Sequence, residues 1–181
     1  MIGKQDILDR AGEWQLRPEI VEKDYILGWL LAAISRHPET CLKWVFKGGT
    51  CLKKCYFETY RFSEDLDFSL LSDALYAEEE IRQVLAEVAR SANELSGVEV
   101  PEAEIRIESL KDKQGNRTFK GRVYYRGPLG RTSLSRVLFD LTKYEELADN
   151  PAHRQVFHPY GDRLPEELRI QTYSLDELLA E

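Results

Sequence analysis

Long apolar runs are absent from this chain of 181 residues. No stretch reaches the ~18 residues that a membrane-spanning helix needs, and residues 1–6 lack the charged-then-apolar pattern of a signal peptide. Cysteine is scarce: Cys41, Cys51 and Cys55 cannot all pair with one another and have no zinc-like spacing. We therefore expect a cytoplasmic protein with reduced thiols, and its length suits one domain with its own core.

Basic residues are outnumbered by acidic residues, 25 against 32, and the resulting net charge of −7 argues against a general nucleic-acid binder. Segment 111–136 is the exception. It carries eight basic residues and one acid, a net +7 that leaves −14 on the rest of the chain. Such asymmetry indicates a surface that faces a polyanion, and the alternative is a solvated hairpin rich in lysine and arginine. The histidines, His37, His153 and His158, are scattered and suggest no chemistry.

Apolar periodicity predicts the following elements. We expect helices over 18–37, 50–57 and from a Ser72-Asp73 cap to about 94, where Gly97 ends the third helix. We expect strands over 43–46, 66–71, 104–110, 118–126, 136–143 and 168–173, with a hairpin turn at 111–117. Residues 145–166 hold three prolines and predict a loop. Ser174-Leu-Asp-Glu177 is a capping-box pattern that predicts a last helix.

This order of elements predicts a mixed α/β protein of the α+β class, with one sheet and helices packed mainly on one face. We expect one domain over 1–181, with an N-terminal helix at about 18–37 and a core at about 43–145. A helical region should start at about 174. An apolar-periodic helix that stops within two turns, at Glu181, suggests a domain taken from a longer protein.

Two aspartates one residue apart suggest a cation site. Asp65 and Asp67 lie at the start of the predicted strand 66–71, so their carboxylates should share one face. Two such carboxylates can bind one magnesium ion or bridge two. Asp140 is the natural third acid, because it alternates with apolar residues in a later strand. The alternative for the pair alone is a polar strand entry.

A glycine turn precedes the acidic pair. Lys47-Gly48-Gly49-Thr50 follows a predicted strand and opens a helix, so its free amides and the helix dipole could hold a phosphate. Thr50 could cap the helix or donate to a phosphate oxygen. Arg61 could neutralise phosphate charge, and Ser63 could contact phosphate or a metal-bound water. The alternatives are a plain left-handed turn and, for the side chains, surface residues; for Lys53 and Lys54 the surface interpretation is preferred.

The combination of these blocks resembles the nucleotidyltransferase superfamily, whose fold is that of DNA polymerase β. It is closer to one branch, the AbiEii/AbiGii toxin family of type IV toxin–antitoxin and phage abortive-infection systems. The resemblance runs from about residue 18 to the end. The blocks that carry it are Val21-Glu-Lys-Asp-Tyr25, Phe46-Lys-Gly-Gly-Thr50, Arg61-Phe-Ser-Glu-Asp-Leu-Asp-Phe68 and Tyr173-Ser-Leu-Asp-Glu-Leu-Leu-Ala-Glu181.

The resemblance implies transfer of a nucleoside monophosphate from a nucleoside triphosphate to an acceptor hydroxyl, such as a tRNA 3′ end, and a cognate antitoxin partner. It places Asp65, Asp67 and Asp140 as catalytic residues that bind Mg²⁺ or Mn²⁺. The triphosphate would lie against Lys47, Gly48, Gly49, Thr50, Arg61 and Ser63. The family pattern continues beyond Glu181 with a lysine and an Arg-Asp block, so we expect these residues alone to have weak or no activity.

Other functional classes remain open at this stage. A module that binds GTP or ATP without transferring it would use the same cradle. A haloacid-dehalogenase-type phosphatase also carries Asp-x-Asp, but Ser63-Glu64 before the pair and Phe68-Ser69 after it do not fit that pattern. A sugar transferase that uses Asp-x-Asp would not account for the preceding Gly-Gly-Thr turn.

Overall fold

The computed structural model describes residues 1–58, 61–113, 115–143, 147–166 and 168–180. Part of the expected 145–166 loop, and Glu181 at the end of the last quoted block, lie outside these residues. The elements in chain order are α1 (Lys4–Trp14), α2 (Pro18–Arg36), α3 (Thr40–Lys43), β1 (Trp44–Lys47), α4 (Gly48–Cys51), the π-helical turn η1 (Leu52–Tyr56), β2 (Asp65–Leu70), α5 (Glu78–Ser96), the 3₁₀ turn η2 (Glu102–Glu104), β3 (Arg106–Lys111), β4 (Arg117–Tyr125), β5 (Ser135–Thr142), β6 (Ala152–Gln155), β7 (Arg169–Thr172) and α6 (Leu175–Ala180).

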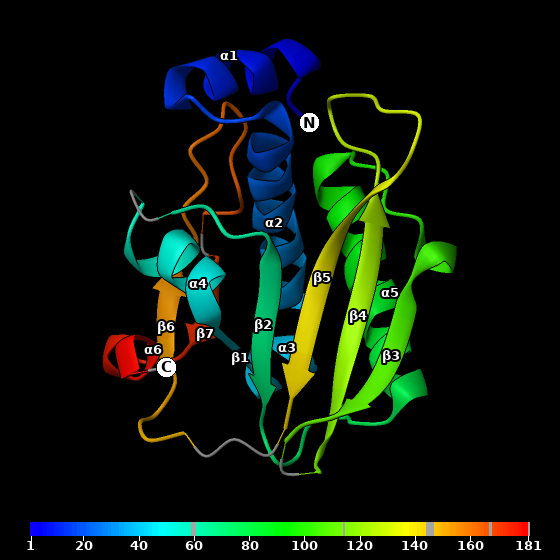
Figure 1. The fold of residues 1–181 in the computed structure, drawn as a ribbon, viewed down its shortest axis with the longest axis vertical. Helices are drawn as coiled ribbons and strands as arrows, with labels where there is room; N and C mark the ends of the chain where they lie inside the picture. The colour runs from blue at the N-terminus through cyan, green and yellow to red at the C-terminus, as the bar shows by residue number, and fades with distance from the viewer. Residues whose placement is uncertain (59–60, 114, 144–146, 167, 181) are drawn as a thin grey trace.

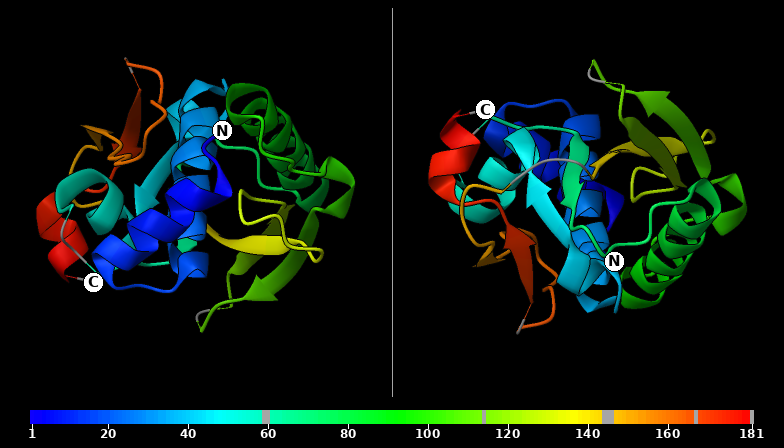
Figure 2. Two further views of the ribbon diagram at one scale, coloured as in Figure 1. Left: turned by 90° about the horizontal axis from the view of Figure 1, so that it is seen from above. Right: turned by 90° about the horizontal axis from the view of Figure 1, so that it is seen from below.

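A mixed sheet organises the chain (Figure 1). Its seven strands follow the order β3-β4-β5-β2-β1-β7-β6. The pairs β2–β5 and β1–β7 are parallel, and the other neighbours are antiparallel. The two end-on views in Figure 2 show α2 and α5 on one side of the sheet. The predicted α+β class, with a mixed sheet and helices mainly on one face, is therefore confirmed.

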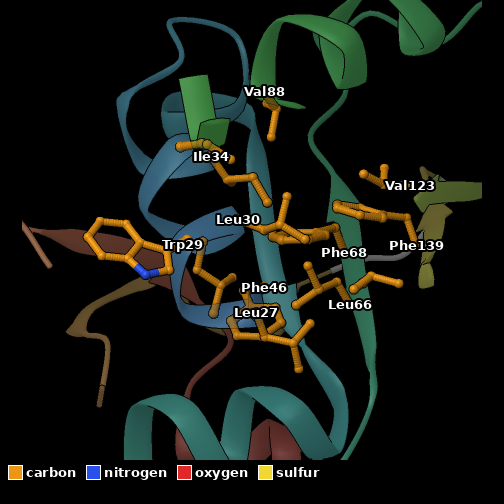
Figure 3. Packing of buried hydrophobic residues seen from close by; sticks show 14 of the residues in the cluster. Leu27, Trp29, Leu30, Ile34, Phe46, Leu66, Phe68, Val88, Val123 and Phe139 are labelled. Atoms are coloured by element: carbon orange, nitrogen blue, oxygen red, sulfur yellow. The ribbon is translucent and has the colours of Figure 1, made fainter. Parts of the chain in front are cut away.

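The core lies between the sheet and these two helices (Figure 3). Leu27, Leu30 and Ile34 on α2 pack towards the alternating apolar residues of β1, β2 and β5, including Phe68 and Phe139. Helix α2 is buried around nearly its whole circumference over residues 21–34, as expected of a helix in the middle of a domain. This packing fixes which face of each central strand is apolar, and hence which face carries the polar side chains.

Several local predictions are confirmed. Gly97 ends α5 in the left-handed region, with φ of +73°. Strands β3 and β4 form the expected hairpin. The Ser174 hydroxyl accepts a hydrogen bond from the Glu177 amide at the start of α6. Cys41, Cys51 and Cys55 are free thiols. Among the described helices, none has both the length and the apolar character of a membrane span.

Helix α3 was not predicted, and Lys43, expected in a strand, is its last residue; three larger differences follow. Helix α1 was not predicted, because only Ile7 and Ala11 of it are buried and its apolar signal is therefore weak. Helix α5 begins at Glu78 rather than after Ser72-Asp73, and Glu80 accepts the hydrogen bond from the Ala77 amide there. Strand β6 lies within the expected loop: it is mostly exposed and is defined by its pairing with β7, which its composition does not reveal.

Candidate active site

Strand β2 places the two predicted acids on one face of the sheet. Leu66 and Phe68 are fully buried and face the helices, so Asp65 and Asp67 point to the opposite face, which α2 and α5 leave open towards the viewer in Figure 1. Asp140 on β5 is the direct register partner of Asp67 in the parallel pair. The three carboxylates therefore come from adjacent strands and share one face.

The glycine turn reaches the same place. Strand β1 pairs with β2 so that Lys47 is opposite Asp67, and the chain then turns into α4 at Gly48 with φ of +74°. A Cβ atom at Gly48 would lie 2.4 Å from Asp67 Oδ2. Only glycine lets the main chain approach the carboxylate this closely in this conformation. The turn and the acidic pair, 15 residues or more apart in sequence, are therefore one site.

Arg61 and Ser63 border the same turn. A Cβ atom at Gly49 would lie 3.5 Å from Ser63 Oγ and 3.6 Å from Arg61 Nη2. The segment before β2 thus places a hydroxyl and a guanidinium against the start of α4, where first-turn amides have no intrahelical acceptor. These groups are suited to hydrogen-bonding with phosphate oxygens.

Thr50 and Lys47 make contacts that brace the turn. The Thr50 side chain is buried, and its hydroxyl donates to the main-chain oxygen of Asp65 at 2.5 Å. The hydroxyl therefore ties α4 to the start of β2. The Lys47 ammonium lies 5.8 Å from the centre of the Tyr173 ring, a cation–π distance. Both predicted residues therefore lie at the site, where the Thr50 hydroxyl contacts a main-chain oxygen.

The pKa of the Asp65 carboxyl is raised by its surroundings. Burial raises the pKa of its carboxyl, the charges of Lys23 and Lys120 lower this pKa, and nearby Glu64 and Asp140 raise it. The Lys120 ammonium lies 3.6 Å from an oxygen of Asp140, and Lys23 is hydrogen-bonded to Glu64. Two lysines therefore hold a cluster of acids that would otherwise repel one another.

The sequence did not assign these two lysines to the site. Lys23 is in α2, which is remote from β2 in the chain, and Lys120 is one of eight basic residues of segment 111–136. The register of β4 against β5, which pairs Lys120 with Asp140, is set by the fold. Within the described residues, no group of three or more His, Cys, Asp or Glu side chains is gathered as a metal cluster.

The surface interpretation of Lys53 and Lys54 is wrong. Both are buried, and Lys54 forms a salt bridge of 2.7 Å with Asp24. The Tyr160 hydroxyl also donates to Asp24, and the Lys53 ammonium lies 4.5 Å from the Phe62 ring centre. This buried pair joins α2 to the turn that follows the glycines, because Lys54 belongs to η1.

The other members of the Val21–Tyr25 block fasten further segments to α2. The buried Glu22 carboxylate accepts a hydrogen bond from the Leu129 amide at 2.7 Å. The Tyr25 hydroxyl donates to Asp162 at 2.7 Å. Together with Lys23 and Asp24, these residues connect one helix to four separate parts of the chain. The block therefore connects α2 to the segments that form and border the site.

Comparisons with known proteins give the family of the chain and a structural neighbour. A family model described as "Nucleotidyl transferase AbiEii toxin, Type IV TA system" matches residues 29–181. A search of curated protein sequences found no match. Among solved structures, MenT4, a nucleotidyltransferase toxin from Mycobacterium tuberculosis H37Rv, superposes with a TM-score of 0.54 at 21% identity.

That superposition covers 99% of this chain and 57% of the MenT4 chain, so this chain spans little more than half of its structural neighbour. At this identity the likeness supports the fold alone. The family assignment instead follows from the match over residues 29–181, which includes the glycine turn, the acidic pair and Asp140. The chain belongs to the AbiEii family of nucleotidyl transferase toxins.

Proposed function

We propose that this protein transfers a nucleoside monophosphate from a nucleoside triphosphate to an acceptor hydroxyl. The observation that carries the proposal is the contact between Gly48 and Asp67, because it joins the glycine turn to the carboxylates. A triphosphate held at the turn would lie against Arg61 and Ser63 with its α-phosphorus beside the acids. Inline attack by the acceptor would then release pyrophosphate.

The donor set fits a hard divalent cation. Asp65, Asp67 and Asp140 offer carboxylate oxygens, the ligands that Mg²⁺ and Mn²⁺ prefer, and a triphosphate held at the glycine turn would bring further oxygens. We propose Asp65, Asp67 and Asp140 as the residues that would hold Mg²⁺ or Mn²⁺. Such a cation would neutralise charge on the attacking and leaving oxygens.

The chain's own residues supply positioning and electrostatics. Arg61 offers a fixed set of donors to phosphate oxygens, and Ser63 offers a hydroxyl beside it. Lys47 and Lys120 place positive charge on either side of the acids. Thr50 keeps the start of α4 at a constant distance from Asp65. These groups are in place before substrate arrives, so little reorganisation is needed during the reaction.

The acceptor and the cellular setting belong to the same proposal. A tRNA 3′ end is the acceptor that we favour, because it provides a hydroxyl on a polyanion and segment 111–136 carries surplus positive charge. Four of its basic residues are paired with acids: Lys120 with Asp140, Arg122 with Glu108, Arg126 with Glu99 and Arg131 with Glu19. We also propose a cytoplasmic location and a cognate antitoxin that restrains the activity.

The test supplies each labelled ribonucleoside triphosphate together with total cellular RNA and a divalent cation, and follows label in the RNA. Asp65→Asn and Asp67→Asn should abolish incorporation. Asp73→Asn is the matched control, since its carboxylate is 70% exposed and pairs with Lys43. Incorporation that survives in both site variants would overturn the assignment.

A module that binds nucleotide without transferring it is the alternative outcome. In that case the wild-type protein would bind a nucleoside triphosphate with cation-dependent affinity, yet label would enter neither RNA nor protein. Equilibrium dialysis with the same labelled nucleotides separates binding from transfer. Addition of a total protein fraction in place of RNA tests a protein acceptor.

A further inference from the structure

A cavity lies beside the acids, at the end of the sheet where β2 and β5 begin. Its volume is about 320 Å³, and its lining includes Arg17, Lys23, Tyr124, Arg131, Arg136 and Glu64. Glu64 and Lys23 also act on the pKa of Asp65, so the cavity adjoins the reaction centre.

The cavity has a surplus of positive charge. Its lining contains four cations, Arg17, Lys23, Arg131 and Arg136, against two carboxylates, Glu19 and Glu64. Glu19 pairs with Arg131 and Glu64 with Lys23. Within the described residues, no ion pair is recorded for Arg17 or Arg136. Both guanidinium groups are exposed, and they are available to an anionic ligand.

An aromatic ring stands among these cations. Tyr124 is half-buried and is the direct cross-strand partner of Arg136, so the two side chains share one face of the sheet. A phenol ring beside guanidinium groups matches a nucleotide, because the ring can stack on a base while the cations contact phosphates.

The position of the cavity decides which substrate enters it. The triphosphate cradle is on the β1 side of β2, whereas Tyr124 and Arg136 are on β4 and β5, on the other side of β2. Arg136 precedes Leu138, the register partner of Asp65, by two residues, or about 7 Å along the strand. In an in-line displacement, the attacking and leaving oxygens lie on opposite sides of phosphorus.

We propose that this cavity binds the 3′-terminal nucleotides of a single-stranded RNA acceptor and directs its terminal hydroxyl towards Asp65 and Asp140. Tyr124 stacks on a base, and Arg17 and Arg136 contact the phosphodiester backbone. Lys23 stays paired with Glu64 at the junction between cavity and acids. This inference rests on the proposed nucleotidyl transfer, and it assigns the acceptor side of that site.

The experiment measures RNA binding and nucleotide binding separately. The RNA probe is a short single-stranded oligoribonucleotide with a 5′ fluorescein and a free 3′ hydroxyl, followed by anisotropy without nucleotide. Tyr124→Ala should weaken its binding roughly 5- to 150-fold, while Tyr124→Phe, which keeps the ring, restores it. Arg136→Ala should reduce the slope of log affinity against log salt by roughly 0.7, the loss of one single-strand phosphate contact.

Arg169→Ala is the matched control, because this exposed arginine lies on β7, outside both the cavity and the basic segment 111–136. It should leave RNA affinity within about twofold. In Tyr124→Ala and Arg136→Ala the affinity for each ribonucleoside triphosphate, measured by dialysis with the cation present, should stay unchanged. Melting temperatures establish that the variants are folded.

Three results would overturn the inference: unchanged RNA affinity in both Tyr124→Ala and Arg136→Ala, a selective loss of triphosphate binding, or a wild-type protein that does not bind the oligoribonucleotide. The second would make the cavity a base pocket for the triphosphate, and the third would favour a protein acceptor. Anisotropy measures binding without turnover. A protein that binds the RNA through this cavity but transfers no nucleotide would therefore contradict the proposed function and support the cavity assignment.

Discussion

Replacing Gly48 by alanine tests whether the glycine turn and the acids work as one site. The substitution has two separable effects. It places a side chain at a φ of +74°, which L residues other than glycine rarely adopt. It also introduces a methyl group 2.4 Å from Asp67 Oδ2, so the carboxylate or the turn must move. The first effect concerns stability, and the second concerns chemistry.

Gly97 offers a control for the first effect. Its φ of +73° is nearly the same, and nothing lies within 4 Å of a Cβ atom placed there. Left-handed strain costs about 1–2 kcal/mol for a residue with a Cβ atom. In a protein of this size each kcal/mol lowers the melting temperature by about 2–4 °C. Both Gly48→Ala and Gly97→Ala should therefore melt roughly 2–8 °C below wild type.

Only Gly48→Ala should lose activity. Displacing a catalytic group by about 1 Å can cost ~10²-fold in rate, and the clash with Asp67 demands a shift of this order. The assay is kcat/KM for nucleotide incorporation, at a temperature well below the lower melting point. Cation binding, followed as the rise in melting temperature on adding Mg²⁺, should fall in Gly48→Ala and persist in Gly97→Ala.

Retention of activity in Gly48→Ala at the level of Gly97→Ala would refute the reasoning, because the methyl group could not then disturb a carboxylate that matters. Equal loss of activity in both variants would also refute it, since a general loss of stability would explain the result.

Three further predictions follow from the same contacts. Gly49→Ala makes only ordinary contacts with Ser63 and Arg61 and favours α4, so thermal melting should show unchanged or higher stability while the KM for nucleotide rises roughly tenfold. Lys54→Met strands the buried Asp24 carboxylate and should cost roughly 3–5 kcal/mol in urea unfolding, partly recovered by adding Asp24→Asn. Burial lowers the pKa of His158 to about 4, so stability should be lost as pH falls from ~6.5 towards ~4, by up to about 3 kcal/mol, and His158→Gln should flatten this dependence.

Local patterns predicted much of this protein. The alternation around Asp65 and Asp67 predicted a strand with both carboxylates on one face, and the apolar spacing of α2 and α5 predicted helices. Gly97 and Ser174 predicted helix ends because capping depends on the few residues that form the cap. Helix α1 and strand β6 escaped prediction, because each is defined by what it packs or pairs against.

The sequence by itself determined the chemistry on offer: paired carboxylates, a glycine turn, and an arginine and a serine between them. Their residue types and spacing are local facts. Tertiary structure alone decided the partners. It placed Lys23 and Lys120 beside the acids, drew Lys54 inward to Asp24, and gathered Arg17, Tyr124 and Arg136 around one cavity. Strand register and helix packing depend on burial across the whole core, which no single segment encodes.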